Sequence, residues 1–400
     1  MSPNLQQLFR IAGKPTRMII GLMSGTSVDG LDIALCSVYG SGLDTKLELL
    51  HFETVAYTDE FKTAIRAVFA KKNIDLEKLC LLHPRIALQH ASMVNECLKK
   101  WNFKAGEIDL IASHGQTIFH IPPSVQHQNK SGSASLQIGD GDHLAAATGI
   151  ITISDFRQKH IAAGGEGAPL AVYGDHILFM KAVEDRILLN IGGIANFTYL
   201  PGKGEDGKII CTDVGPGNTM MDAYMQQHFP GKYFDDGAAI AKAGMINDKL
   251  LTALKENIFF DQPFPKSTGP ELFNLEYLET AKQKTNSISL SVEDTMATLN
   301  KFSADMITAA IRESIKNKNG IGIFVSGGGI HNALLMEHIK EQLPGCGFHT
   351  TGELGINPDA KEAVLFALLA NECVCGDPSL FKNLPEGIPA VSMGKISFPV

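Results

Sequence analysis

The chain has 400 residues, of which 44% are hydrophobic and 20% charged, a composition typical of a globular protein with more than one domain. Its formal net charge of -8 argues against nucleic acids and anionic membranes as partners, because both bind basic surfaces. No apolar run approaches the roughly 20 residues of a membrane span, and residues 1–17 lack the apolar core of a signal peptide. Seven scattered cysteines favour reduced thiols. We therefore expect a cytoplasmic protein.

The first half of the chain alternates between predicted strands and helices. Strands are predicted at 18–23, 31–38 and 47–55, and two helices follow within 59–101. Two short buried strands come next, one ending at His114 and the other at Asp155. This alternation predicts an α/β sheet with helices on its faces.

The second half repeats the beginning of the first. A second strand pair starts near residue 186, and Ile187 follows Ile19 by 168 positions. A strand ending at Asp213, two helices, a strand beginning at residue 321 and further helices at 331–343 and 359–374 complete the pattern. We predict two related domains that face a cleft, at 17–150 plus about 376–400 and at 151–375.

The motif GLMSGTSVDGLD, at residues 21–32, places hydroxyl and carboxylate side chains in a strand, a turn and a strand. Glycine lets the backbone approach an anion, N–H and hydroxyl groups can surround phosphate oxygens, and Asp29 and Asp32 can hold a metal. A plain hairpin turn is the alternative. The P-loop pattern with its terminal lysine is absent, which disfavours a Walker-type NTPase.

Two more glycine-rich segments follow predicted strands. DVGPGN, at 213–218, would place Asp213 at a strand end and aim the amides of a helix N-terminus at an anion, unless Asp213 only caps the turn. SGGGIHN, at 326–332, would let a flat base or sugar lie against three glycines, although a tight turn has the same composition.

Polar side chains follow two other predicted strand ends. His114, Gln116 and Thr117 follow one, and Asp155 and Arg157 follow the other. These groups suit a polyhydroxylated or carboxylate-bearing ligand, whereas a buried histidine bonded to backbone is the alternative for His114. PKSTG, at 265–269, adds a basic loop rich in hydroxyls, or an exposed turn.

Together with LQIGDG, TGIITISDFR, AAGGEGAPL and LNIGGIANFTYL, these motifs resemble those of the anhydro-N-acetylmuramic acid kinase family, in the actin, Hsp70 and sugar-kinase superfamily. The resemblance spans about 18–372. It implies an α/β fold with two RNase H-like (actin-like ATPase) domains flanking a nucleotide cleft. It also implies that 1,6-anhydro-N-acetylmuramic acid, ATP and water become N-acetylmuramic acid 6-phosphate and ADP, in murein recycling, and that the protein is a homodimer.

The resemblance also implies roles for individual residues. Asp213 would be the catalytic base, and Glu362 would lie near the reacting groups. Asp29 and Asp32 would hold Mg²⁺. The expected sugar contacts are His114, Gln116, Thr117, Gln137, Asp155 and Arg157. The expected ATP contacts are Gly25, Thr26, Ser27, Val28, Asp29, Gly30, Leu31, Asp32, Gly192, Gly193, Asn196, Gly215, Gly217, Asn218, Gly327, Gly328, Gly329 and Asn332.

The chain departs from the family pattern in three motifs. DFRQKH replaces DFRRRD at 155–160, Glu166 replaces a glutamine, and Pro270 replaces an arginine. These changes concern sugar contacts and leave the expected ATP chemistry intact. An ordinary sugar kinase of the same superfamily is the alternative function. An Hsp70-like nucleotide-gated ATPase is less favoured, because we expect a peptide-binding domain in such a protein.

Overall fold

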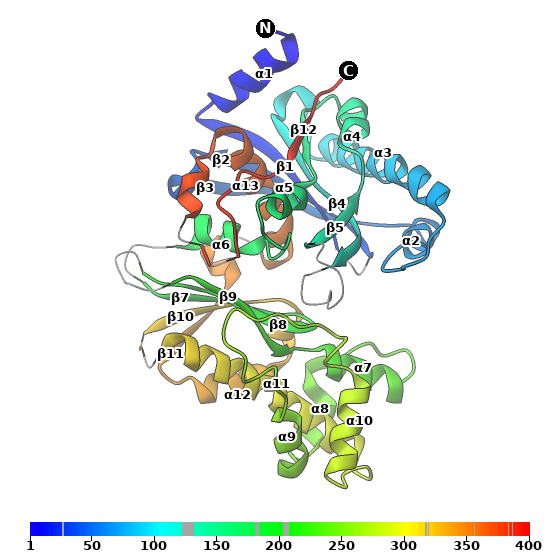
Figure 1. Cartoon of the computed structure of the whole chain (residues 1–400), viewed down its shortest axis with the longest axis vertical. Helices are drawn as coiled ribbons and strands as arrows, with labels where there is room; N and C mark the ends of the chain where they lie inside the picture. The colour runs from blue at the N-terminus through cyan, green and yellow to red at the C-terminus, as the bar shows by residue number, and fades with distance from the viewer. Residues whose placement is uncertain are drawn as a thin grey trace. The chain divides into compact units, whose positions relative to one another are not determined.

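The computed structural model describes residues 1–25, 28–121, 132–180, 184–202, 208–316, 318, 320–355, 357–382, 384–385 and 387–400. The chain forms two compact units (Figure 1). Unit 1 comprises Met1–Phe179 and Gly355–Val400, and unit 2 comprises Met180–Leu354. Among the described helices, none combines the length and the hydropathy needed to cross a membrane.

The sheet of unit 1 has β1 as its central strand. Strand β1 (Thr16–Ser24) pairs antiparallel with β2 (Gly30–Tyr39) and parallel with β4 (Leu110–Ile121). In the described part of the chain the strand order is β12-β6-β4-β1-β2-β3, and β5 pairs with β4. The remaining strands are β3 (Lys46–Ala56), β5 (Ala134–Ile138), β6 (Thr152–Ser154) and β12 (Lys395–Ser397).

Two helices cover this sheet. Helix α3 (Leu76–Lys100) begins after Asp75, whose carboxylate accepts hydrogen bonds from the first-turn amides, and its apolar side chains join the core over β1 and β4. Helix α13 (Lys361–Cys375) is buried from Ala363 to Glu372, as expected for a helix that is apolar on all sides. The other helices are α1 (Pro3–Ala12), α2 (Asp59–Arg66), α4 (Gly141–Thr148), α5 (Phe156–Ala162) and α6 (Ala171–Phe179).

Unit 2 is built around β7 (Arg186–Ile191). Its sheet has the order β11-β10-β7-β8-β9 in the described residues, and α11 (Val292–Ile315) crosses its core (Figure 1). The other strands are β8 (Ile194–Leu200), β9 (Ile210–Pro216), β10 (Ile321–Ser326) and β11 (Cys346–Thr350). The other helices are α7 (Thr219–His228), α8 (Ala239–Ala243), α9 (Asp248–Lys255), α10 (Leu275–Lys284) and α12 (Ala333–Gln342).

The two sheets share one arrangement of strands. In each, a central strand pairs antiparallel with the next strand of a three-stranded meander and parallel with a later strand. Ile19 and Ile187 both lie in the central strand, at the position where each pairs with the parallel neighbour. The predicted fold class, α/β with two RNase H-like units, is confirmed.

The boundaries between the two compact units lie after Phe179 and after Leu354, whereas the predicted domain boundaries lie at 150 and about 375. Strand β6 pairs with β4, so the segment after residue 150 belongs to unit 1. Helix α13 packs on β1, so the segment from residue 355 also returns to unit 1. Both pairings join distant parts of the chain, which the local sequence pattern does not reveal.

Two strands run further than their predicted ends. Strand β4 continues past His114 to Ile121, because β5 pairs with its second half and Gly115, at φ +72°, lies where the register with β1 shifts. Strand β9 continues past Asp213 to Pro216, again with a shifted register. The predictions that these strands end at His114 and Asp213 were wrong.

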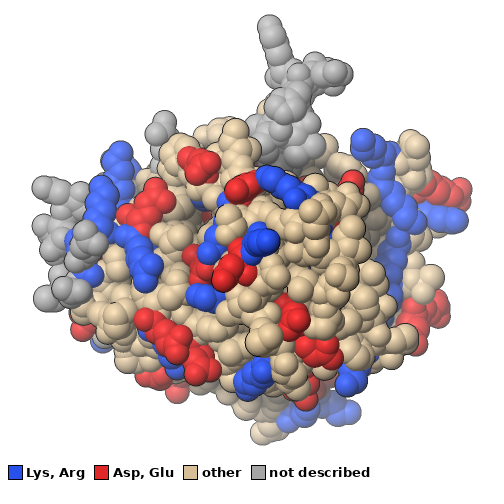
Figure 2. Space-filling model, turned by 90° about the horizontal axis from the view of Figure 1, so that it is seen from below, with Lys and Arg blue, Asp and Glu red and all other residues tan. Residues whose placement is uncertain are grey.

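Charge is mixed on the face that Figure 2 displays. Lysine and arginine side chains alternate there with aspartate and glutamate, and no extended basic surface is seen on that face.

Candidate active site

A pocket of about 370 Å³ in unit 1 gathers several of the predicted site residues. Its walls come from the end of β1, the middle of β4, the start of α5 and the start of α13. The polar side chains are thus supplied by segments more than 300 residues apart in the sequence. The lining residues are Met23, Ser24, Gly25, His114, Thr117, Arg157 and Glu362.

His114 orients the guanidinium of Arg157. Arg157 Nε donates to His114 Nε2 at 3.0 Å, so the ring accepts there and carries its proton on Nδ1, 2.9 Å from the Gly115 oxygen. Burial, aided by the arginine charge, lowers the pKa of His114 to about 3. Arg157 Nη1 donates to the Gly167 oxygen at 2.7 Å. His114 is therefore neutral and serves to hold Arg157.

Glu362 lies in the first turn of α13. Its side chain is reached by solvent through the pocket, although protein atoms surround it closely, and burial raises its pKa while Arg157 opposes that shift. A Cβ on Gly21 would lie 1.9 Å from the Ala363 oxygen, so only glycine allows β1 and α13 to pack backbone against backbone. This contact fixes the height of Glu362 over the sheet.

Three of the expected sugar contacts are absent from the lining of this pocket. Gln116 is fully buried, and its amide bonds to Ser24, Gly25 and Thr117. Gln137 Nε2 donates to Thr117 Oγ1 at 3.2 Å, and Asp155 forms an ion pair with Lys395. The structure thus places these three side chains in support of neighbouring residues.

His160, one of the departures from the family pattern, lies beside Arg157 in unit 1 and bonds to the same glycine. His160 is fully buried, its pKa is lowered by burial to about 4, and its Nδ1 accepts from the Gly167 amide at 2.9 Å. Arg157 bonds to the oxygen of that same glycine. Glu166, the second departure, is exposed to solvent.

The predicted metal ligands lie at the hairpin between β1 and β2. Asp29 is exposed, and Asp32 Oδ1 accepts from Thr54 Oγ1 at 2.6 Å. Burial raises the pKa of Asp32.

Thr26 and Ser27, which the sequence also assigns to ATP, lie outside the described residues. Val28, Gly30 and Leu31 are buried, and Val28 has a φ of +59°, an uncommon conformation for a β-branched residue.

Within the described residues, no group of three or more His, Cys, Asp or Glu side chains could hold a metal ion. A magnesium site in a phosphoryl-transfer enzyme takes one or two carboxylates and completes its shell with water and phosphate oxygens. The arrangement of Asp29 and Asp32 is compatible with that kind of site.

In unit 2, the carboxylate of Asp213 is held on one side. Its Oδ2 accepts from Ser267 Oγ and from the Thr268 amide, both at 2.9 Å. Among the described residues no donor bonds to Oδ1. Burial raises the pKa of Asp213, the bonds to Thr268 and Ser267 lower it, and the charge of Glu271 raises it. One oxygen is thus fixed while the other stays open to a ligand.

The loop that carries Ser267 is fastened to the strand that carries Asp213. The Asp213 amide donates to the Lys266 oxygen at 3.0 Å, and the Lys266 amide donates to Thr212 Oγ1 at the same distance. Lys266 Nζ bonds to the carbonyl oxygens of Phe259 and Phe260. From the sequence, this loop is a candidate ligand-binding segment because it is basic and rich in hydroxyls. Nothing in the sequence indicates that it lies beside Asp213.

The glycine segments of unit 2 meet one another around the turn after β7. The Gly217 and Asn218 amides donate to the Gly193 and Gly192 oxygens at 2.8 and 2.9 Å. A Cβ on Gly217 would lie 2.3 Å from the Gly192 oxygen, and a Cβ on Gly327 would lie 2.7 Å from the Ile191 oxygen. Glycine is therefore required at these crossings.

Other glycines there leave free space. A Cβ on Gly328 would meet only Asn218 Nδ2, at 3.9 Å, and Gly193 is exposed. A flat ligand could lie along this backbone. Asn332 Oδ1 accepts from the Leu335 amide and from Asn300, and Asn196 lies opposite Asp213 in the sheet. Gly215 and Gly329 are buried within the same segments.

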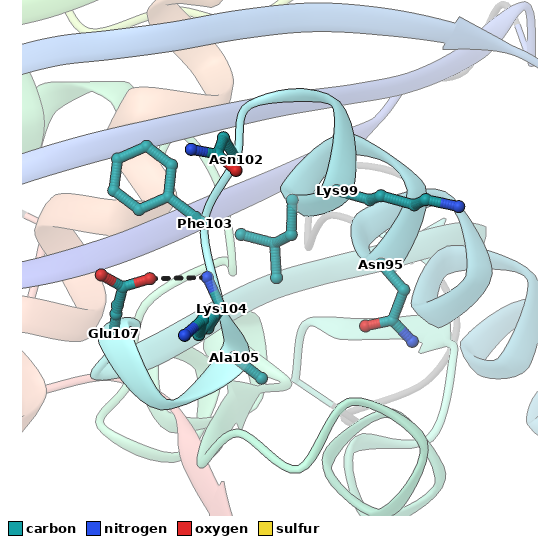
Figure 3. Close-up of a pocket in the computed structure, with 8 residues that line it drawn as sticks. Asn95, Lys99, Asn102, Phe103, Lys104, Ala105 and Glu107 are labelled. Carbon is teal, nitrogen blue, oxygen red and sulfur yellow. Dashed lines mark hydrogen bonds between the residues drawn. The ribbon is translucent and has the colours of Figure 1, made fainter.

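A larger pocket, of about 530 Å³, lies at the end of α3 and the turn after it (Figure 3). Its charged side chains, Lys99, Lys104 and Glu107, are exposed. None of the predicted site residues lines it, and we assign it no part in the chemistry. Its lining comprises Asn95, Leu98, Lys99, Asn102, Phe103, Lys104, Ala105 and Glu107.

Comparison with known proteins decides the family. The model of the family "Anhydro-N-acetylmuramic acid kinase" matches residues 17–398. The chain belongs to the anhydro-N-acetylmuramic acid kinase family. A protein of that name from Pseudoalteromonas translucida is 54% identical over 399 residues, with all of both chains covered. Another from Caldanaerobacter subterraneus is 38% identical, covering 98% of this chain and all of its own.

Likeness to solved structures is distant. The ADPNP-bound activator of 2-hydroxyisocaproyl-CoA dehydratase from Clostridium difficile gives a TM-score of 0.39 at 11% identity, covering 89% of this chain and 95% of that one. A likeness of this degree adds nothing to the assignment of the family.

Proposed function

We propose that this protein uses ATP and water to convert 1,6-anhydro-N-acetylmuramic acid into N-acetylmuramic acid 6-phosphate and ADP, in the recycling of murein. Membership of the family over nearly the whole chain supports this reaction. The observation that carries it is the carboxylate of Asp213, which has one oxygen fixed by Ser267 and Thr268 and the other open.

Asp213 is the proposed general base. The anhydro bridge joins O6 to C1, so O6 carries no proton and is a poor acceptor until the C1–O6 bond breaks. Asp213 takes a proton from a water molecule whose oxygen forms the new bond to C1. The electron pair of the C1–O6 bond goes to O6, which attacks the γ-phosphorus of ATP, and ADP leaves. Burial keeps the carboxylate more basic than in water, which suits proton abstraction.

The pocket of unit 1 is the proposed sugar-binding surface. Arg157 is held by His114 and Gly167, so its charge is pre-positioned for an anionic or polyhydroxylated ligand. Thr117 and Glu362 add hydroxyl and carboxyl groups to the same pocket. We propose that these residues bind the sugar and that Gln137 acts through Thr117.

The glycine segments fit a nucleotide. The open space beside Gly328 and the exposed backbone of Gly193 suit a flat base or a phosphate chain. We propose that they, with the hairpin after β1, bind ATP. Asp29 and Asp32 present carboxylate oxygens for Mg²⁺, which in bound form neutralises charge on the phosphates.

A coupled assay of ADP release tests the proposal. The purified chain should release ADP with 1,6-anhydro-N-acetylmuramic acid and should be far slower with glucose or with N-acetylglucosamine. Equal rates with the plain sugars would favour the ordinary sugar kinase. We also propose a cytoplasmic homodimer, for which the support is the family resemblance, and light scattering of the purified protein tests the dimer.

A further inference from the structure

The side-chain amide of Gln116 has a fixed orientation. Its Nε2 lies 3.3 Å from both the Gly25 and the Thr117 carbonyl oxygens, so the NH₂ group must point to them and donate. Its Oε1 therefore faces Ser24 Oγ, at 2.6 Å, and accepts the Ser24 hydroxyl proton. Gln116 thus joins the last residues of β1 to β4 beneath the pocket.

The same reasoning fixes the next two protons. Because Ser24 donates to Gln116, its oxygen accepts from Tyr57 OH, at 2.9 Å. Because Tyr57 donates to Ser24, its oxygen accepts from His90 Nε2, at 2.7 Å. His90 is then the neutral tautomer protonated on Nε2, and its buried Nδ1 has no partner among the described residues. Burial lowers the pKa of His90 to about 3, so the ring stays neutral.

Tyr57 contacts the hairpin at both ends. Its hydroxyl bonds to Ser24, and its backbone amide donates to the Asp29 oxygen at 3.0 Å. Tyr57 is 4% exposed, its ring contacts that of Phe61 at a centroid distance of 4.9 Å, and it lies parallel to the ring of His90. A chain of hydrogen bonds therefore begins at His90 on helix α3. It ends at two residues that line the pocket, Gly25 and Thr117.

We propose that His90, Tyr57, Ser24 and Gln116 form a one-directional hydrogen-bond chain that positions the β1–β2 hairpin, and that Tyr57 and Gln116 are positioning residues for the reaction. Every donor in the chain points toward Gln116, so one tautomer of His90 fits. Gln116 is then a support of the hairpin and does not touch the sugar. The kinetic consequence rests on the proposed function, whereas the proton order does not.

The tautomer of His90 tests the order directly. Nitrogen NMR of the protein labelled with ¹⁵N-histidine, with the signal assigned from His90→Gln, should show a neutral ring protonated on Nε2 throughout pH 6 to 8. A ring protonated on Nδ1, or one that titrates in this range, would overturn the proposal. This measurement uses the unaltered chain and needs no activity.

Tyr57→Phe tests the positioning. Loss of the hydroxyl should shift the Gly25 and Val28 amide resonances, relax the His90 tautomer to a mixture, and lower kcat/KM for the anhydro sugar by about tenfold or more. The matched control is Tyr277→Phe, which removes a tyrosine hydroxyl bonded to the Leu254 oxygen at 2.6 Å in unit 2. The Tyr277→Phe protein should lose about as much thermal stability as the Tyr57→Phe protein, but its kcat/KM should stay unchanged.

The outcomes separate the two proposals. Wild-type kcat/KM in a folded Tyr57→Phe protein, or unmoved Gly25 and Val28 amides, would reject the positioning role. If the unaltered protein fails to turn over the anhydro sugar, the proposed function fails, and the tautomer and amide shifts still decide the hydrogen-bond chain. Gln116→Leu, which keeps the volume and removes the donors, should reproduce the Tyr57→Phe amide shifts.

Discussion

Ser267 Oγ donates a hydrogen bond to Asp213 Oδ2 at 2.9 Å, across 54 residues of sequence. The bond engages the same oxygen that accepts from the Thr268 amide. The two donors on Oδ2 fix the plane of the carboxylate. Oδ1 is then the oxygen that remains open as an acceptor. This asymmetry is what a base needs if it is to take a proton from one direction.

Asp213→Asn removes the basic oxygen and keeps the shape of the side chain. We expect turnover to fall by on the order of 10² to 10⁴, the usual scale for loss of a general base. Binding of ATP, measured by calorimetry, should stay within a few fold. A folded variant with nearly normal turnover would show that another group takes the proton.

Ser267→Ala should move the pH profile. The Ser267 bond favours the charged carboxylate and lowers the pKa of Asp213 against the effect of burial, so its loss raises that pKa. A base with a higher pKa is protonated at higher pH, and the acid limb of kcat/KM should shift upward. Ser267→Thr keeps a hydroxyl and should shift it less. A limb at the same pH in all three proteins would contradict the assignment.

Activity should depend on a divalent ion held by Asp32. Excess chelator should abolish turnover, and Mg²⁺ should restore it, because the ion prefers oxygen ligands and phosphate partners. Asp32→Asn should raise the Mg²⁺ concentration needed for half-maximal rate by about tenfold or more. The control is Asp59→Asn, an exposed carboxylate at the start of α2. Full activity in chelator would rule the metal out.

Oxygen labelling distinguishes the proposed reaction from its alternatives. If Asp213 activates water against C1, reaction in ¹⁸O water should place label on the anomeric carbon of the sugar phosphate and none on the transferred phosphate. The product must be trapped early, by rapid borohydride reduction, since anomeric exchange scrambles the label. An ordinary sugar kinase would leave that carbon unlabelled, and an ATPase would label free phosphate.

Glu372 should make unfolding depend on pH. Glu372 is 3% exposed, and its carboxyl accepts from the Gly42 amide at 3.0 Å and from Asn371, yet burial raises its pKa above the usual value. A folded-state pKa above the unfolded one adds stability below the unfolded pKa, and that stability is lost as pH rises through the folded pKa.

Glu372→Gln removes this titration. The melting temperature of the variant relative to the unaltered chain should therefore increase between pH 4 and pH 8. Glu337→Gln, at an exposed position of α12, provides the comparison. A difference for Glu372→Gln that stays flat across this range would mean that the carboxyl does not titrate there.

The elements were predictable because their signals are local. The spacing of apolar residues gave the strands around Ile19 and Ile187 and the helix that carries Glu362, and the structure has all three. The ends of β4 and β9 were missed because their last residues pair with β5 and β8 across irregular registers, and this pairing does not show in the local pattern of apolar residues. The same limit applies to the domain boundaries, which depend on where β6 and α13 return.

The support of the site was hidden from the sequence for another reason. Tyr57 and His90 stand in no motif, and a single tyrosine or histidine in an apolar helix or strand has many ordinary roles. Their meaning lies in distances of 2.7 and 2.9 Å across the core. Gln116 stands within a motif that predicts a sugar contact, but a motif does not tell which way an amide points.

Unit 1 is assembled from both ends of the chain, whereas unit 2 is one continuous stretch, Met180–Leu354. During synthesis the ribosome must release α13 before unit 1 can bury Gly21 against it, and must release β12 before that strand can join β6. We therefore expect unit 2 to complete its fold before unit 1, in contrast to the usual order in which the N-terminal domain folds first. A premature stop near residue 355 would thus spare the sequence of unit 2 and leave unit 1 as the aggregation-prone part of the nascent protein.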